Sequence, residues 1–109
     1  MKKNIIFMTA LKANDPNMFD YMEWSLKTWK WWASKNNAEL FLLEEPLCDT
    51  EIMRPTWQRW HVYDILEAND IEYNQVALID IDTMVHWNCP DIFKLSNGKY
   101  TAVKDDLSI

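Results

Sequence analysis

The sequence predicts an α/β domain in which helices cover both faces of a small parallel sheet. Short apolar runs at residues 4–9, 39–43 and 75–79 lack a helical period, which is typical of strands buried on both faces. Two longer segments with helical apolar spacing separate these runs, and alternating strands and helices form parallel sheets through right-handed crossovers. The chain has 109 residues, of which 49% are hydrophobic, so we expect one domain over residues 1–109.

The first helix is predicted to start at Pro16, with Asp15 as its N-cap, and to end near Asn36 and Asn37. Along this helix, apolar side chains recur with helical spacing at Met18, Met22, Leu26, Trp29 and Trp32. Glu44, Glu45 and Pro46 then end the second strand.

The second helix is predicted over residues 55–68, where Pro55 opens a stretch in which aromatic and apolar residues return to helical spacing. The third strand, residues 75–79, delivers Asp80 and Asp82 at or just past its carboxyl end. A turn at residues 88–90, one helical turn at 91–95 and a strand at 99–103 complete the expected order.

Charge and composition exclude several classes of protein. Seventeen acidic and eleven basic residues give a net charge of -6, which repels nucleic-acid phosphates. Apolar runs are far shorter than the roughly 20 residues that cross a bilayer, so we expect no transmembrane segment. Cys48 and Cys89 lack metal-type spacing and suit a reduced, cytoplasmic setting, although a disulfide between them stays open.

A ligand site is expected outside the carboxyl ends of the strands, where open parallel sheets bind their ligands. This rule places residues 9–12, 44–45 and 80–82 along one edge. Gly98 is the single glycine, so neither glycine-rich phosphate loop is present. Phosphate must therefore bind in another way.

Asp80 and Asp82 are the strongest candidate ligands of a metal. Residues two apart on a strand point to the same side, so the two carboxylates project together while Ile81 turns toward the core. Such a pair repels itself unless a cation neutralises it, and Mg²⁺ or Mn²⁺ binds carboxylates together with substrate phosphates. The alternative is that both aspartates merely end a strand.

The surrounding residues resemble the D-x-D region of GT-A glycosyltransferases, especially glycogenin-like retaining enzymes. The resemblance lies in residues 76–85 (VALIDIDTMV), followed by residues 89–93 (CPDIF). It implies a Rossmann-like parallel-sheet sandwich of the GT-A type that binds a nucleoside diphosphate sugar. The acceptor-binding half of such enzymes has no counterpart here, so we expect a minimal relative or part of a larger enzyme.

The resemblance also assigns roles to residues. Asp82 would be the principal ligand of Mn²⁺ or Mg²⁺, and Asp80 would contact the ribose or sugar as well as the metal. Thr9, Ala10 and Leu11 would border the nucleoside. No catalytic residue, donor base, sugar or acceptor is implied.

Two arginines and two histidines are further candidates for a role in the site. Arg54 or Arg59 would contact the diphosphate or position the first aspartate, although each is also explained as a solvated surface charge. Glycogenin-like enzymes carry a histidine ligand far downstream of the D-x-D. His86 lies too close to be assumed its equivalent, and we expect it to pack or to hydrogen-bond near the turn; His61 is expected to pack.

Two other functions remain open. An apolar strand leading into residues 80–83 (DIDT) also resembles the first motif of haloacid-dehalogenase-type phosphatases, in which Asp80 would be the nucleophile. The glycine usual beside that motif is absent. Alternatively, Tyr21, Trp24 and Trp31 lie off the main apolar stripe of the first helix and predict a docking surface for a second copy or another domain.

Overall fold

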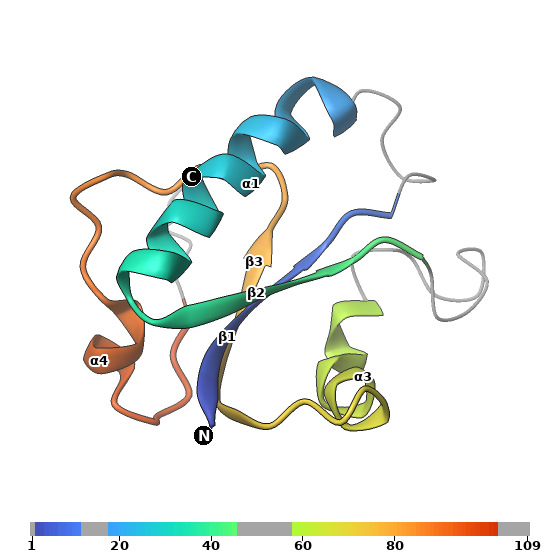
Figure 1. The fold of residues 1–109 in the computed structure, drawn as a ribbon, viewed down its shortest axis with the longest axis vertical. Helices are drawn as coiled ribbons and strands as arrows, with labels where there is room; N and C mark the ends of the chain where they lie inside the picture. Colours follow the sequence, from blue (N-terminus) through green and yellow to red (C-terminus); the bar gives the residue numbers. More distant parts are fainter. Residues whose placement is uncertain (1, 12–17, 46–57, 103–109) are drawn as a thin grey trace, which may run out of the picture.

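A computed structural model describes residues 2–11, 18–45 and 58–102. Its sheet has three parallel strands, β1 (Lys3–Thr9), β2 (Ala38–Leu43) and β3 (Tyr73–Asp80), in the order β2-β1-β3 (Figure 1). All three predicted strands are therefore confirmed, each extended by one to three residues. The small α/β domain with a parallel sheet is compatible with a Rossmann-like fold.

Helices lie on both faces of this sheet, as the sequence predicted. Helix α1 (Met18–Lys35) covers one face, and the 3-10 helix η2 (Arg59–His61) with α3 (Val62–Ala68) covers the other (Figure 1). The short helix α4 (Ile92–Ser96) follows β3. None of the helices in the described part of the chain is long and apolar enough to span a bilayer.

The central strand β1 separates two apolar clusters. Ile6 and Met8 pack with Trp29 and Trp32 of α1, while residues of the opposite parity pack with α3. The second cluster comprises Ile5, Phe7, Val62, Ile65 and Leu66. This alternation is the burial on both faces that an unbroken apolar run predicts, because successive strand side chains point to opposite sides.

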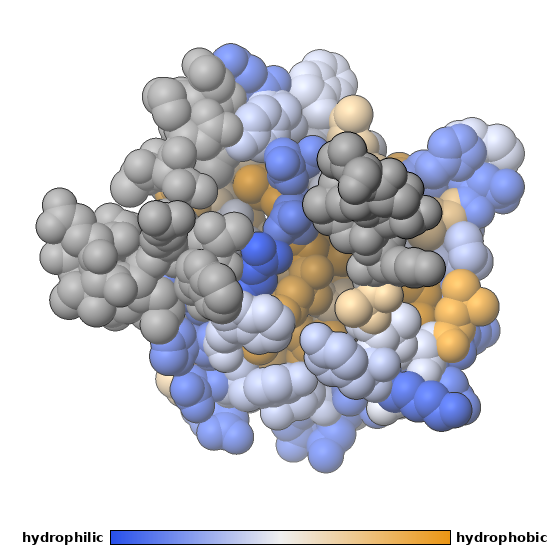
Figure 2. All heavy atoms as spheres, turned by 180° about the vertical axis from the view of Figure 1, so that it is seen from behind, coloured by the Kyte–Doolittle hydropathy of each residue, from blue (hydrophilic) through white to orange (hydrophobic). Residues whose placement is uncertain are grey.

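Strand β3 is the outermost strand on its side among the described residues, and its apolar side chains are only half-buried. Seen from behind, the molecule exposes apolar surface along its middle (Figure 2). The strand nevertheless carries apolar residues to both cores, with Ala77 and Ile79 facing α1 and Val76 and Leu78 facing α3. Packing on both faces of the sheet therefore fixes the path of the β3 backbone up to its carboxyl end.

The helix ends follow from local chemistry. Asn37 has a φ of 55°, a left-handed conformation that asparagine tolerates and that turns the chain from α1 into β2. The second predicted helix begins as a 3-10 turn at Arg59, and its predicted first residues, 55–57, lie outside the described residues. The predicted turn at 91–95 is α4, whose N-cap Asp91 accepts a hydrogen bond from the Phe93 amide at 3.0 Å.

The strand predicted at 99–103 is wrong for residues 99–102, which form no strand, and Val103 lies outside the described residues. The Lys99 amide donates to the Ser96 carbonyl at 3.0 Å. The hydroxyls of Ser96 and Thr101 both donate to the Lys99 carbonyl, at 2.7 and 3.2 Å. These local side-chain bonds offer the backbone an alternative to a strand ladder, which β propensity alone does not anticipate.

Adjacent tryptophans of α1 provide a test of this packing. Trp32 is fully buried whereas Trp31 is largely exposed. Trp32→Ala removes a large core side chain and should lower the free energy of unfolding by about 3–5 kcal/mol, while Trp31→Ala should cost less than about 1 kcal/mol. Urea denaturation followed by circular dichroism measures both, and equal losses would contradict the assignment of faces.

Candidate functional site

The carboxyl ends of the three strands meet at one edge, as predicted. Thr9, the last residue of β1, lies in register with Leu43 of β2 and Asp80 of β3. The Ala10 amide continues this pairing by donating to the Leu43 carbonyl at 2.8 Å. Because the strands end together, the polar residues that follow them share the edge at which open α/β sheets bind ligands.

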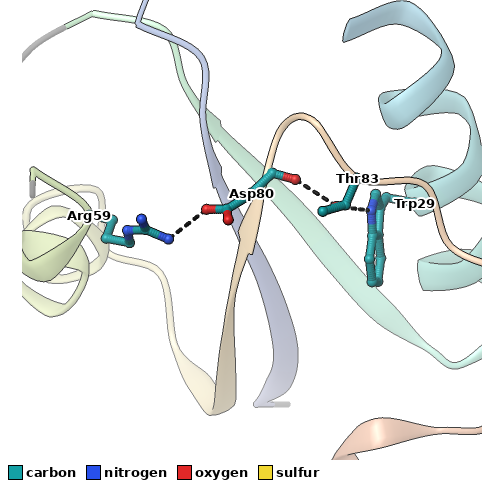
Figure 3. Close-up of polar contacts among 4 residues, drawn as sticks. All are labelled: Trp29, Arg59, Asp80 and Thr83. Carbon is teal, nitrogen blue, oxygen red and sulfur yellow. Dashed lines mark hydrogen bonds and ion pairs between the residues drawn. The ribbon is translucent and has the colours of Figure 1, made fainter. Parts of the chain in front are cut away.

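Asp80 closes β3 and directs its side chain toward the face covered by η2 and α3. Its Oδ1 lies 2.7 Å from Nη1 of Arg59, in a charge-assisted hydrogen bond (Figure 3). The Arg59 side chain is 24% exposed and the Asp80 side chain 57% exposed. The structure thus pairs one of the two candidate arginines with the first aspartate, and the carboxylate remains open to solvent.

The backbone carbonyl of Asp80 is held from the opposite face. The Thr83 hydroxyl donates to this carbonyl at 2.7 Å and accepts the indole N–H of Trp29 at 3.2 Å (Figure 3). The Thr83 amide also donates to the same carbonyl, at 3.3 Å. Trp29 is buried in α1, so the threonine connects the end of β3 to the rigid core.

The chain that follows is fixed to α1 at two further points. The Val85 amide donates to the Thr28 hydroxyl at 3.1 Å, and the Trp32 indole N–H donates to the Cys89 carbonyl at 3.3 Å. Val85 is itself buried against the α1 side of the sheet. Three consecutive contacts with one helix therefore hold residues 83–89 in place.

Asp82 lies in the turn just past β3, within the position range that the sequence predicted. Ile81 packs against the α1-side core and Asp82 is exposed, but both residues belong to the turn, so the expected projection of the two carboxylates to one side stays a prediction. The strand stops at Asp80 because its carbonyl is taken by the Thr83 hydroxyl and amide. Both aspartates are therefore accessible from solvent at the end of the same strand.

The donor set suits a hard cation that shares its shell with a ligand. No group of three or more histidine, cysteine, aspartate or glutamate side chains that can hold a metal occurs within the described ranges. Two carboxylates are nevertheless a typical protein contribution to a Mg²⁺ or Mn²⁺ shell, with substrate phosphates and water completing it. The accessible Asp80 and Asp82 match that chemistry.

The other predicted site residues are distributed as follows. Thr9 is half-buried at the shared edge, and the Ala10 and Leu11 side chains are buried. Any contact of Ala10 or Leu11 with a nucleoside would therefore be made through the backbone. Arg54 lies outside the described residues.

The histidines take structural roles. Nδ1 of His86 accepts the Asn88 amide at 3.0 Å, which confirms the expected hydrogen bond near the turn. His61 is partly exposed at the end of η2 and lies 3.6 Å from the Asp64 carboxylate. The Cys89 thiol is free.

A separate shallow pocket lies at the opposite edge of the sheet. It has a volume of about 380 Å³ and is lined partly by Lys3, Lys30 and Asn37, near the start of β2. Since the aspartates follow the carboxyl end of β3, this pocket does not include them. We assign the candidate site to the strand ends because the two exposed aspartates are there.

Two residues of the site are not among those that the sequence predicts to form it. The sequence predicts Trp29 as part of an apolar helical stripe and Thr83 as part of the D-x-D region. One signal was present, because a buried indole N–H requires an acceptor and a threonine hydroxyl can accept a hydrogen bond. The sequence did not indicate which acceptor the indole would find.

Comparisons of the chain with models of known protein families, with curated proteins and with solved structures found no match.

Replacing the Thr83 hydroxyl tests the connection between Asp80 and α1. Thr83→Val keeps the shape but leaves the Trp29 indole N–H without its partner, and should cost about 1–2 kcal/mol of unfolding free energy. Thr83→Ser keeps the hydroxyl and should cost less than half as much. Urea denaturation measures the free energy of unfolding of both variants. Equal losses for the serine and valine variants would show that the hydrogen bonds of the Thr83 hydroxyl do not contribute to stability.

Proposed function

We propose that this domain is the nucleotide-binding part of a GT-A-type glycosyltransferase. In this proposal Asp80 and Asp82 bind a divalent cation together with the diphosphate of a nucleoside diphosphate sugar. The observation that carries it is the placement of two accessible carboxylates at the shared carboxyl edge of a parallel sheet, with Arg59 beside the first. The D-x-D resemblance in residues 76–93 supports the same assignment.

In this proposal the side chains of Asp80, Asp82 and Arg59 bind a diphosphate in different ways. Asp80 and Asp82 supply oxygen ligands to the cation, and the guanidinium of Arg59 supplies N–H donors that match phosphate geometry. Thr83 and Trp29 fix the backbone from which the carboxylates project. When bound, Mn²⁺ or Mg²⁺ would neutralise charge that develops on the departing diphosphate.

The sequence around Asp80 ranks this proposal above a phosphatase. The glycine usual beside the phosphatase motif is absent from residues 80–83. The ion pair with Arg59 does not separate the two functions, because it engages Oδ1 of Asp80 and leaves the second oxygen free either to bind a cation or to attack phosphorus.

Isothermal titration with uridine and guanosine diphosphates tests the proposal. One of the two nucleotides should bind in the presence of Mn²⁺ and lose binding when the metal is chelated. Asp82→Asn removes a ligand charge at constant size and should weaken this binding at least about tenfold, the equivalent of about 1.4 kcal/mol.

Asp70→Asn is the matched control, because Asp70 is exposed and its φ of 55° is as favourable for asparagine as for aspartate. This control should bind like the parent protein. Equal affinities of the Asp82→Asn variant and the parent would remove the carboxylate pair from the site. Hydrolysis of p-nitrophenyl phosphate with Mg²⁺ by the parent would favour the phosphatase instead.

A further inference from the structure

The outward face of α1 carries aromatic and basic side chains in alternation. Trp24 and Trp31 are 56% and 47% exposed, and they lie two helical turns apart on the face that points away from the sheet. The Lys27 ammonium lies 4.9 Å from the centre of the Trp24 ring, and the Lys35 ammonium lies 5.1 Å from that of Trp31. We call these four residues, with exposed Lys30, the tryptophan–lysine face.

A second exposed segment borders this face. Thr28 lies four residues after Trp24 and three before Trp31, so it is a helical neighbour of both indoles. The Thr28 hydroxyl accepts the Val85 amide, and this bond holds the segment around Val85 against that side of α1. Met84 and Trp87, each 69% exposed, flank Val85. The exposed apolar surface thus continues from α1 onto the chain that follows β3.

The charge of the face is opposite to that of the whole chain. The chain carries a net charge of -6, yet three lysines gather on the outward side of α1. Two acidic residues also lie on this side of α1, since Glu23 forms an ion pair with Lys27 at 3.2 Å and Asp20 is exposed one turn before Trp24. The three lysines exceed these two carboxylates by one, so the face keeps a small positive charge. Charges on the far side of the domain act weakly here, because physiological salt screens them over about 8 Å.

This combination fits a lipid surface better than a protein. The core of a protein interface is enriched in tryptophan, methionine and arginine but depleted in lysine, whereas the tryptophan–lysine face has lysine beside both indoles and no arginine. At a bilayer surface, indole rings occupy the headgroup level, and lysine stems lie along apolar surface with their ammonium groups at the phosphates. Each cation–π pair places an ammonium group over an indole ring, so that a positive charge and an aromatic surface lie within about 5 Å of each other.

We propose that the tryptophan–lysine face docks onto an anionic lipid surface. Trp24 and Trp31 enter the headgroup region, and Lys27, Lys30 and Lys35 contact lipid phosphates. Helix α1 lies parallel to the surface over roughly 27 Å, the length of its 18 residues. Met84 and Trp87 extend the contact. This proposal does not depend on the sugar-nucleotide site, and its test does not involve Asp80 or Asp82.

Co-sedimentation of the full chain with vesicles tests the proposal. Vesicles that contain phosphatidylglycerol in phosphatidylcholine should bind the protein, and added salt should weaken the binding. Pure phosphatidylcholine vesicles should bind at least tenfold more weakly. The double variant Lys27→Gln/Lys35→Gln should lose about 25-fold in affinity, from about fivefold for each lysine. The double variant Trp24→Ser/Trp31→Ser should also lose binding.

Matched controls come from other parts of the surface. Trp60 is as exposed as Trp24 but belongs to η2 on the opposite face of the sheet, and Lys94 is an exposed lysine of α4. Trp60→Ser and Lys94→Gln should retain binding, and circular dichroism verifies that every variant is folded.

Three results would each overturn the proposal. The first is no binding to either kind of vesicle, and the second is equal binding to both. The third is self-association of the parent protein in sedimentation velocity that Trp24→Ser/Trp31→Ser abolishes, which would assign the face to a second copy of the chain.

Discussion

The Thr83 hydroxyl is the point on which the geometry of the candidate site depends. It accepts a hydrogen bond from the buried Trp29 indole and donates one to the Asp80 carbonyl, so it fixes where β3 ends. The buried Trp29 indole N–H needs an acceptor, and the Thr83 hydroxyl supplies it, whereas the bond from this hydroxyl to the Asp80 carbonyl lies at the exposed edge of the sheet. The turn that carries Asp82 is therefore tied to the core of the domain rather than to its surface.

The Arg59–Asp80 pair acts on this fixed end from the other face of the sheet. A partly exposed ion pair contributes only about 0–1 kcal/mol to stability, so folding does not depend on it. Its consequence is local, because it sets the direction of one carboxylate and places a cationic group next to the position proposed for a diphosphate. Contacts from both sides thus hold the backbone and the side chain of Asp80 separately.

The elements of the fold could be predicted because their signals are local. The apolar runs and the helical spacing predicted three strands and α1 to within a few residues. The short helical turn predicted from Asp91 is α4, with Asp91 as its N-cap. The strand predicted at residues 99–103 is wrong for 99–102, because the hydroxyls of Ser96 and Thr101 donate to the Lys99 carbonyl. Such local side-chain bonds compete with strand pairing, and strand propensity does not include them.

The contacts that build the site had no such local signal. Trp29 and Thr83 are 54 residues apart, and Arg59 and Asp80 are 21 apart. The sequence identified the carboxylates from their spacing and position after a strand. It could not choose between Arg59 as a surface charge and as a partner of Asp80, because that choice depends on where η2 packs against the sheet.

Paramagnetic broadening by Mn²⁺ in ¹H–¹⁵N spectra tests the central claim most directly, since it reports where a cation resides. Broadening should begin at the amides of Asp80, Asp82 and Thr83 and extend across the strand ends to Ala10. Asp82→Asn should weaken it. Broadening centred on the acidic residues of α3, or spread evenly over the acidic surface, would contradict the account.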